Sequence, residues 1–293
     1  MGIIEDYRGL ESEVLQKIAQ NKKGAEGYDA YYVLMKDAIK EDRAWGVAGL
    51  KRLRGMLHTA VAENIGKDMG LCNTLIEMDR KALFAAAPFD LDYFMLALEN
   101  NRPAQEQFWK PRRGHLMPIC EALQAMEFDE LDELFLSCPP RVGKTTMVVI
   151  FMLWVMGRNS ERSNLYCSFT SKPVETFYDG LLEVLKDPMT YNYREIFPNS
   201  KLVGTNANDT TIDLDRKKRY HSFTGRPIGG SLNGSCDCYG YIVADDLVSG
   251  IEEAMSKERM ASLWFKVDNN FITRAKEQCK RLWIGTRWSL IDP

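Results

Sequence analysis

The chain has 293 residues, 45% of them hydrophobic and 11% aromatic, which is enough apolar side chain for one large domain or two smaller ones. The formal net charge of −3 excludes a strongly basic nucleic-acid-binding protein, so any DNA contact has to come from local patches. The longest apolar run, Met147 to Met156, is far shorter than the ~20 residues of a membrane span. The seven cysteines contain no CxxC pair, so we expect reduced thiols in an intracellular protein without a membrane segment, and we interpret Cys236 and Cys238 as structural.

The first third of the chain has the spacing of helices. Apolar residues recur at intervals of three to four from about Glu5 to Asn100, for example in Leu50-Leu53-Leu57-Val61. A proline then follows, and the character of the sequence changes. We therefore predict a helical N-terminal region over residues 1–102 and a second domain over residues 103–293.

The second part alternates short apolar runs with helical stretches. The runs are ELFLSC, NLYCSF, YGYIVA and RLWIG, and helices are expected from Lys144, Pro173 and Ile251. This alternation predicts the α/β class, with a mostly parallel sheet flanked by helices. The segment TTIDLDRKKRYHSF has the outline of a hairpin with a basic turn.

The segment CPPRVGKTT, between Cys138 and Thr146, has the composition of a phosphate-binding loop. It follows an apolar strand and precedes a helix, which is the context that such a loop requires. Gly143 permits close backbone approach to phosphate, the Lys144 amine reaches the β- and γ-phosphates, and the Thr145 hydroxyl coordinates Mg²⁺. The alternative is a chance GKT tripeptide at the start of a helix.

The loop departs from the usual pattern at its first position, where Cys138 replaces glycine. Pro139 and Pro140 have no N–H group, so the phosphate cradle has to begin at Arg141. The predicted nucleotide-binding residues are Pro140, Arg141, Val142, Gly143, Lys144, Thr145 and Thr146.

The run YGYIVADD is an apolar strand that ends in two carboxylates, about a hundred residues after the loop. A carboxylate at this end of a parallel strand lies beside the phosphate loop, so Asp245 is predicted to hold Mg²⁺ together with Thr145. Asp246 is predicted to orient or deprotonate the attacking water. The alternative is that the pair only caps the next helix.

Three segments resemble the large terminase subunits of phages. They are the loop PPRVGKT, the glycine-rich approach GRPIGGSLNGSCDCYGYIVADD, and IGTRWSLID, which is similar to the coupling segment of that family although Ser289 stands where histidine is common. The resemblance extends from about Phe108 to the end of the sequence. The helical third carries no motif of the family.

The resemblance implies a P-loop NTPase of the additional-strand (RecA/ASCE-like) type that uses ATP and Mg²⁺. It further implies a motor that translocates double-stranded DNA into a procapsid, as a homo-oligomeric ring with a portal protein and a small terminase subunit as partners. The expected location is the host cell cytoplasm, at the procapsid portal. The nuclease domain of the family would follow residue 293, so we expect no DNA cleavage by this chain.

The resemblance also suggests individual roles. Lys144, Asp246, Arg141 and Arg226 are the predicted catalytic residues, with Arg141 contacting phosphate. Arg226 is the candidate arginine finger toward a neighbouring subunit, or alternatively a surface arginine. Thr286 is expected to sense the γ-phosphate, while Arg287 and Trp288 either assist coupling or pack.

Other contacts and functions stay open at this point. The basic cluster Arg216–Arg219 could bind the DNA backbone or form an ordinary solvated turn. Gln107, Trp109 and His115 lie where an adenine-contacting segment often occurs. The alternative functions are a small-molecule P-loop kinase, a P-loop helicase or translocase fragment, and a nucleotide-gated docking module without turnover.

Overall fold

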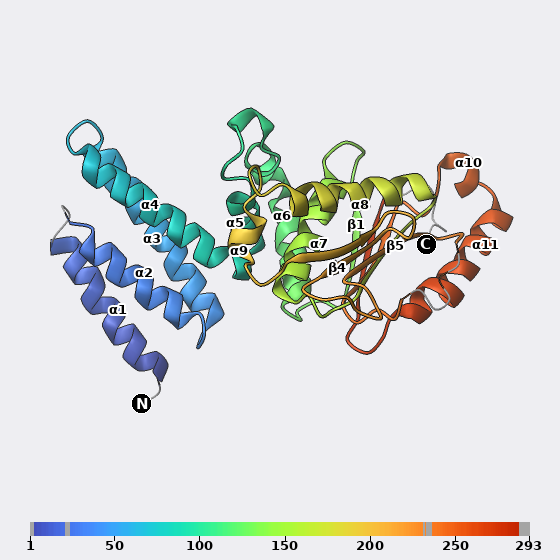
Figure 1. The fold of residues 1–293 in the computed structure, drawn as a ribbon, viewed down its shortest axis with the longest axis horizontal. Helices are drawn as coiled ribbons and strands as arrows, with labels where there is room; N and C mark the ends of the chain where they lie inside the picture. The colour runs from blue at the N-terminus through green and yellow to red at the C-terminus, as the bar shows by residue number, and fades with distance from the viewer. Residues whose placement is uncertain (1–2, 21–23, 231, 233–235, 287–293) are drawn as a thin grey trace. The chain divides into compact units, whose positions relative to one another are not determined.

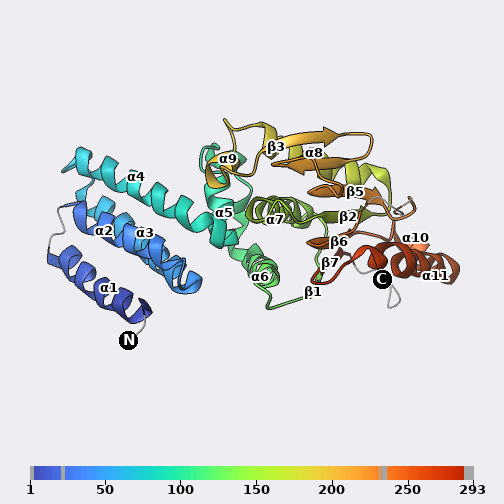
Figure 2. The ribbon, with the colours of Figure 1, turned by 60° about the horizontal axis from the view of Figure 1, so that its bottom comes forward.

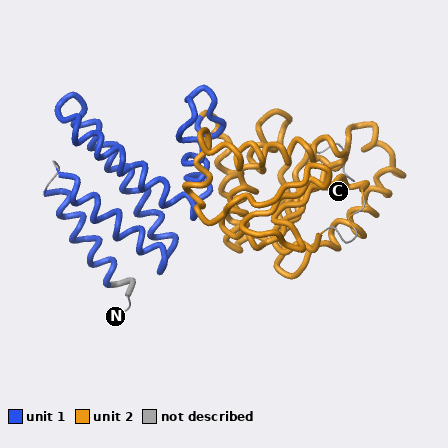
Figure 3. Tube along the Cα trace, viewed as in Figure 1, with its two compact units in different colours: residues 1–110 blue, residues 111–293 orange. Residues whose placement is uncertain are grey.

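The computed structural model describes residues 3–20, 24–230, 232 and 236–286. The chain divides into two compact units, residues 1–110 and residues 111–293 (Figure 3). Residues 103–110 therefore belong to the same unit as the N-terminal helices.

Unit 1 is helical throughout its described residues, as the apolar spacing predicts. Three aspartates, Asp42, Asp68 and Asp90, each begin a helix by accepting a hydrogen bond from the backbone N–H three residues later. Leu50, Leu53 and Leu57 of the predicted stripe are fully buried. The helices are α1 (Ile3–Gln20), α2 (Glu26–Ala38), α3 (Arg43–Asn64), α4 (Met69–Ala86), η1 (Ala87–Phe89), α5 (Leu91–Leu98) and η2 (Ala104–Glu106).

Unit 2 is an α/β unit that follows the alternation of the sequence. Helix α6 (Trp109–Glu127) leads into it from the end of unit 1. Its further helices are α7 (Lys144–Arg158), α8 (Ser171–Lys186), α9 (Tyr193–Ile196), α10 (Ile251–Ala254), α11 (Lys257–Lys266), the π-helical turn η3 (Val267–Phe271) and η4 (Ile272–Arg274). Its strands are β1 (Glu133–Ser137), β2 (Asn164–Ser168), β3 (Leu202–Asn206), β4 (Thr211–Leu214), β5 (Phe223–Pro227), β6 (Tyr241–Asp245) and β7 (Lys280–Gly285).

The strands form a seven-stranded sheet within the described residues, in the order β1-β7-β6-β2-β5-β4-β3 (Figures 1 and 2). The first five strands of this order run parallel to one another, whereas β4 is antiparallel to both of its neighbours, β5 and the edge strand β3. Strand β7, the last in the chain, lies between β1 and β6. The prediction of a mostly parallel sheet flanked by helices, after a helical region, is therefore confirmed.

All four predicted apolar runs are strands, namely β1, β2, β6 and β7. The segment with the basic turn is the antiparallel hairpin of β4 and β5, as expected. The helix expected from Pro173 begins at Ser171. Strand β3 was not predicted, because Gly204 and Asn206 weaken its strand pattern.

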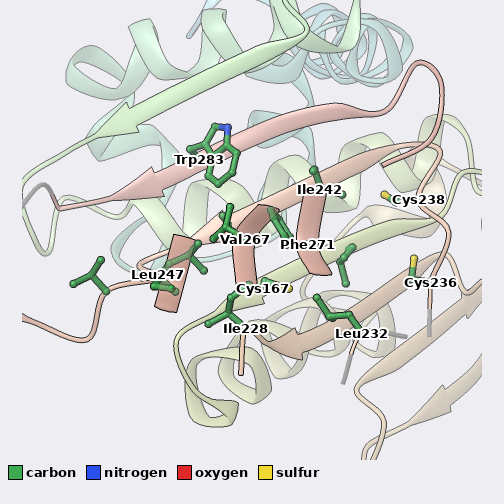
Figure 4. Close-up of a cluster of buried hydrophobic side chains, with 14 of the residues drawn as sticks. Cys167, Ile228, Leu232, Cys236, Cys238, Ile242, Leu247, Val267, Phe271 and Trp283 are labelled. Atoms are coloured by element: carbon green, nitrogen blue, oxygen red, sulfur yellow. The ribbon is translucent and has the colours of Figure 1, made fainter. Parts of the chain in front are cut away.

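Side chains of the central strands alternate between two covered faces. On one face the ring of Tyr241 packs edge-on against Phe151 of α7, and Tyr166 stacks on Phe177 of α8. The opposite face carries a buried cluster in which Phe271, after α11, meets Trp283 of β7 (Figure 4). Both faces of the central strands β2 and β6 are thus buried, which explains their continuous apolar runs in the sequence.

Cysteines gather at the amino ends of β6 and β7. Cys236 and Cys238 are buried in the cluster of Figure 4, which agrees with their structural interpretation. The sulfur atoms of Cys238 and Cys279 lie 3.5 Å apart as free thiols.

No group of three or more His, Cys, Asp or Glu side chains within the described residues is arranged to hold a metal ion. In the same residues, no helix is long and apolar enough to cross a membrane.

Candidate nucleotide site

Three strands bring the predicted motifs to one edge of the sheet. Strands β1, β6 and β7 are parallel, and Ser137 pairs with Gly285 while Asp245 pairs with Ile284, so all three end at the same level. The loop 138–143 follows β1, the acidic pair ends β6, and Thr286 follows β7. Residues separated by more than a hundred positions in the sequence therefore meet at this edge.

The loop after β1 turns through two left-handed residues. Arg141 has φ 67° and Gly143 has φ 97°, and helix α7 begins at the next residue, Lys144. Alternation of left- and right-handed residues makes successive N–H groups converge into an anion-binding concavity. No side chain caps the helix at Gly143, so the N–H groups of the first turn of α7 face the same concavity.

The side chain of Lys144 lies over this loop and contacts both neighbouring strand ends. Its amine is 2.9 Å from Oδ1 of Asp246 and 3.5 Å from Oγ1 of Thr286, and only 10% of the side chain is exposed. The backbone N–H of Thr286 also donates to Oδ1 of Asp246, at 3.1 Å. One carboxylate oxygen therefore connects the loop lysine to the residue after β7.

Asp246 occupies a sparsely populated backbone conformation, with φ 45°. Asp is among the few residues that tolerate this region, and such conformations concentrate at functional sites. The alternative that the acidic pair caps the next helix is wrong, because α10 begins at Ile251 with Gly250 as its N-cap residue. Asp246 is instead directed toward Lys144 and Thr286.

Asp245 is buried, with an exposed fraction of 3%. Its Oδ2 atom accepts hydrogen bonds from the hydroxyls of Tyr166, at 2.9 Å, and Thr145, at 3.3 Å. Its Oδ1 atom has no hydrogen-bond partner among the described residues. Burial raises the pKa of Asp245 to about 6, and the neighbouring Asp246 charge acts in the same direction, against the Tyr166 hydrogen bond that lowers it.

These residues fit a magnesium ion. A second buried oxygen, Oγ of Ser168, also lacks a partner within the described part of the chain, and Ser168 is the cross-strand neighbour of Asp245. The unsatisfied hydroxyl oxygen of Ser168 and the unsatisfied carboxylate oxygen Oδ1 of Asp245 are hard ligands of the kind that Mg²⁺ prefers. The ion commonly binds one or two protein oxygens and takes its other ligands from phosphates and water, so a larger acidic cluster is not required.

Tyr166 and Ser168 were missed by the sequence reasoning. Both lie on β2, whose apolar run predicts only a buried strand. Their relevance depends on β2 being the neighbour of β6, which no local pattern reveals. The signal that could have found them is the polar serine at the end of a fully buried strand.

A cavity of about 360 Å³ borders the same strand ends on the other face of the sheet. Asp246 and Thr286 contribute to its wall, together with the aromatic side chains of Phe135, Trp264 and Trp283. The rings of Phe135 and Trp283 are stacked, with centroids 5.8 Å apart. One side of Asp246 is therefore bounded by aromatic surface.

The Arg226 side chain contacts the turn between β3 and β4 and its own strand β5. Its guanidinium donates to the carbonyl oxygens of Asp209 and Gly225, and lies 3.7 Å from the Asp209 carboxylate. Its side chain is 19% exposed. The structure does not bring Arg226 to the Lys144 amine or the acidic pair by any of these contacts, and its role toward a neighbouring subunit stays a prediction.

The basic cluster Arg216–Arg219 lies between β4 and β5, at the level where β2 begins. Arg216 forms a bidentate ion pair with Glu161, and Lys218 donates to the carbonyl oxygen of Ser160. Arg219 lies over the ring of Tyr220. The cluster therefore lies at the amino ends of the strands, whereas the phosphate loop lies at their carboxyl ends. Most of its charged groups already have partners.

Two residues of the expected adenine-contacting segment have contacts inside unit 1. Trp109 is fully buried and its indole N–H donates to Asp92, and the Gln107 amide donates to the carbonyl oxygens of Glu99 and Arg102. These contacts give both residues a structural role. Arg287, Trp288 and Ser289 of the coupling segment lie outside the described residues.

No protein-family model matches the chain, and no curated protein matches it. The function therefore has to be inferred from the geometry of the site and from the motifs themselves.

Proposed function

We propose that this chain is a Mg²⁺-dependent P-loop ATPase. The observation that carries the proposal is the convergence of Lys144, Thr145, Asp245, Asp246 and Thr286 at the end of three parallel strands, beside a helix whose first turn is open to an anion. Triphosphate binding needs these groups together: N–H donors, a lysine, a hydroxyl and a carboxylate.

The position of β7 supports the additional-strand type. In this type one strand separates the strand of the phosphate loop from the acidic strand, and β7 lies between β1 and β6. Thr286, at its end, therefore lies between the loop lysine and the acidic pair. This position suits a residue that responds to the γ-phosphate.

Each residue of the site has a separate role in the proposed hydrolysis of ATP. Lys144 leaves Asp246 for the β- and γ-phosphates when nucleotide binds, and this frees Asp246 to accept a proton from the attacking water. Thr145 and Asp245 would hold magnesium, which neutralises phosphate charge when bound. The Tyr166 hydroxyl keeps Asp245 oriented.

We further propose that the ATPase is the motor of a terminase large subunit, which translocates double-stranded DNA into a procapsid. The support is the resemblance of PPRVGKT, the glycine-rich approach and IGTRWSLID to that family. The proposed partners are duplex DNA, a portal protein, a small terminase subunit and further copies of the chain in a ring. The proposed place of action is the procapsid portal in the host cytoplasm.

The decisive experiment is steady-state ATP hydrolysis with Mg²⁺, with and without linear duplex DNA. Lys144→Ala and Asp246→Asn should each reduce turnover by at least ~10²-fold, whereas Lys172→Ala, a change at an 83% exposed lysine, should not. Stimulation by DNA would support the packaging motor. Nucleotide binding that depends on Lys144 but proceeds without turnover would favour the docking module, and wild-type protein that does not bind ATP would refute the phosphate loop.

A further inference from the structure

A second cavity, of about 400 Å³, lies beside the nucleotide site at the ends of β2, β5 and β6. Its wall includes Thr170 before α8, Leu247 and Ser249 after the acidic pair, and one side of α11. No residue of the phosphate loop lines it. It is therefore a separate site, connected to Asp246 by adjacent residues of the chain.

Helix α11 presents two basic side chains to this cavity. Arg259, Ser262 and Lys266 occupy one stripe of the helix, because they are spaced three and four residues apart. Met260, Leu263 and Val267 form the neighbouring buried stripe, which fixes the orientation of the helix on the sheet. The basic stripe is thus held in place by the apolar one.

Both basic side chains are available to a ligand. Within the described residues, neither the Arg259 guanidinium nor the Lys266 amine has a hydrogen bond or an ion pair. Arg216 of the same unit, by contrast, is paired with Glu161. Unpaired cations that line a cavity attract an anion, and the amino end of the uncapped helix α8 adds to the same potential.

The carboxylate in this wall belongs to Glu253. Its Oε2 atom accepts hydrogen bonds from the backbone N–H and the hydroxyl of Ser249, both at 2.7 Å. The lining therefore keeps an excess of one positive charge, from two cations and one acid. Phosphate oxygens in nucleic-acid complexes accept hydrogen bonds from groups of this kind: basic side chains, serine hydroxyls such as that of Ser262, and backbone N–H groups at a helix N-terminus.

We infer that this cavity, which we call the α11 groove, binds the phosphodiester backbone of duplex DNA through Arg259 and Lys266. The inference rests on the proposed function, and it names the surface through which that motor contacts its DNA. Because Leu247 directly follows Asp246 and Ser249 is two residues further on, the groove is adjacent in the chain to the acid that acts on ATP in the proposed function. The engaged cluster Arg216–Arg219 lies at the opposite edge of the sheet and has no such connection.

The test is binding of a fluorescein-labelled duplex to the full chain by anisotropy, over a series of KCl concentrations. The double variant Arg259→Ala/Lys266→Ala should weaken binding by at least ~10-fold and reduce the slope of log K against log[salt] by up to about 2. The matched control Lys186→Ala/Lys257→Ala removes the same charge from exposed positions outside the groove and should leave the slope unchanged. Single variants and thermal melting curves exclude a folding defect.

Binding of a fluorescent ATP analogue, measured on the same samples, separates the two sources of phosphate. We expect unchanged ATP affinity in the double variant. The inference is overturned if wild-type protein does not bind the duplex, if the double variant keeps the wild-type slope, if the control loses as much affinity, or if only ATP binding suffers. Failure of the proposed function is distinct, because it would appear as ATP binding that does not depend on Lys144.

Discussion

The hydroxyl of Tyr166 donates a 2.9 Å hydrogen bond to Oδ2 of Asp245, from one strand of the sheet to the next. The tyrosine ring is held in turn by stacking on Phe177, with centroids 3.9 Å apart. A rigid, buried donor thus orients the carboxylate, whose Oδ1 atom has no partner in the part of the chain that the structure describes. Supporting contacts of this kind tune metal affinity as well as geometry.

Tyr166→Phe should therefore raise the Mg²⁺ concentration needed for half-maximal ATP hydrolysis by about 10-fold, with a smaller effect on kcat. The ring and its stacking remain, and only the hydroxyl is lost. The matched control is Tyr241→Phe, because that buried hydroxyl bonds to Glu127 at 2.8 Å and has no contact with the acidic pair. Equal Mg²⁺ requirements in the two variants would contradict a role of Tyr166 at the metal.

The raised pKa of Asp245 predicts a pH-dependent stability. The folded chain holds this proton with a pKa of about 6, against an ordinary value of 3.8. The favourable contribution of the protonated carboxyl is therefore fully present below pH 3.8 and is lost as the pH rises through about 6, at a cost on the order of 3 kcal/mol. Asp245→Asn cannot ionise and avoids this loss.

The measurement is urea unfolding of both proteins without Mg²⁺ at about pH 4.5 and about pH 7.5. The free energy of unfolding of Asp245→Asn minus that of wild type should be larger at the higher pH, because only wild type loses stability as the pH rises. An equal difference at both pH values would show that burial does not perturb Asp245.

Two helical glycines should respond oppositely to alanine. A Cβ atom at Gly157 of α7 would overlap the ring of Phe197, whereas at Gly180 of α8 it would meet Val149 at an ordinary 3.5 Å. We expect Gly157→Ala to destabilise the unit by about 1–3 kcal/mol and Gly180→Ala to be neutral or stabilising by up to about 1 kcal/mol. Thermal or urea unfolding checks both, and a stable Gly157→Ala protein would place Phe197 elsewhere.

Cys279 should be the more reactive thiol of its pair. Its hydrogen bond with Cys238 lowers the pKa of Cys279, whereas burial raises the pKa of Cys238. With limiting iodoacetamide at neutral pH, peptide mass spectrometry should find Cys279 modified several-fold faster than Cys238 or Cys167. Cys238→Ala should slow the reaction of Cys279, and an unchanged rate would refute the thiol contact as its cause.

Local patterns were sufficient to predict the strands with strong apolar signals and the loop between β1 and α7. The helix start at Lys144 follows from the glycine that precedes it, and the β4–β5 hairpin follows from its basic turn. The weak strand β3 was not predicted, because pairing with its neighbouring strand β4 rather than its own residues stabilises it. Short-range rules succeed where the residues themselves determine the conformation.

The order of strands could not be predicted in this way, and much of the site depends on it. Tyr166 contacts Asp245 because β2 happens to lie beside β6, and Thr286 contacts Asp246 because β7 lies on the other side. The sequence predicts that the acidic pair lies beside the phosphate loop, but not the specific contact of Lys144 with Asp246 across a hundred residues. Such contacts arise from tertiary packing, which a single sequence does not display.

The place of β7 between two parallel neighbours also limits how the sheet can move. Sliding β7 by one residue would exchange its two faces and drive Trp283 out of its cluster and Leu282 into it. Strand β7 therefore cannot slide along β1 and β6 without disrupting the buried cluster. In the proposed motor the sheet would therefore act as a stationary frame, and any movement would have to begin at Thr286, the residue that follows the paired strand.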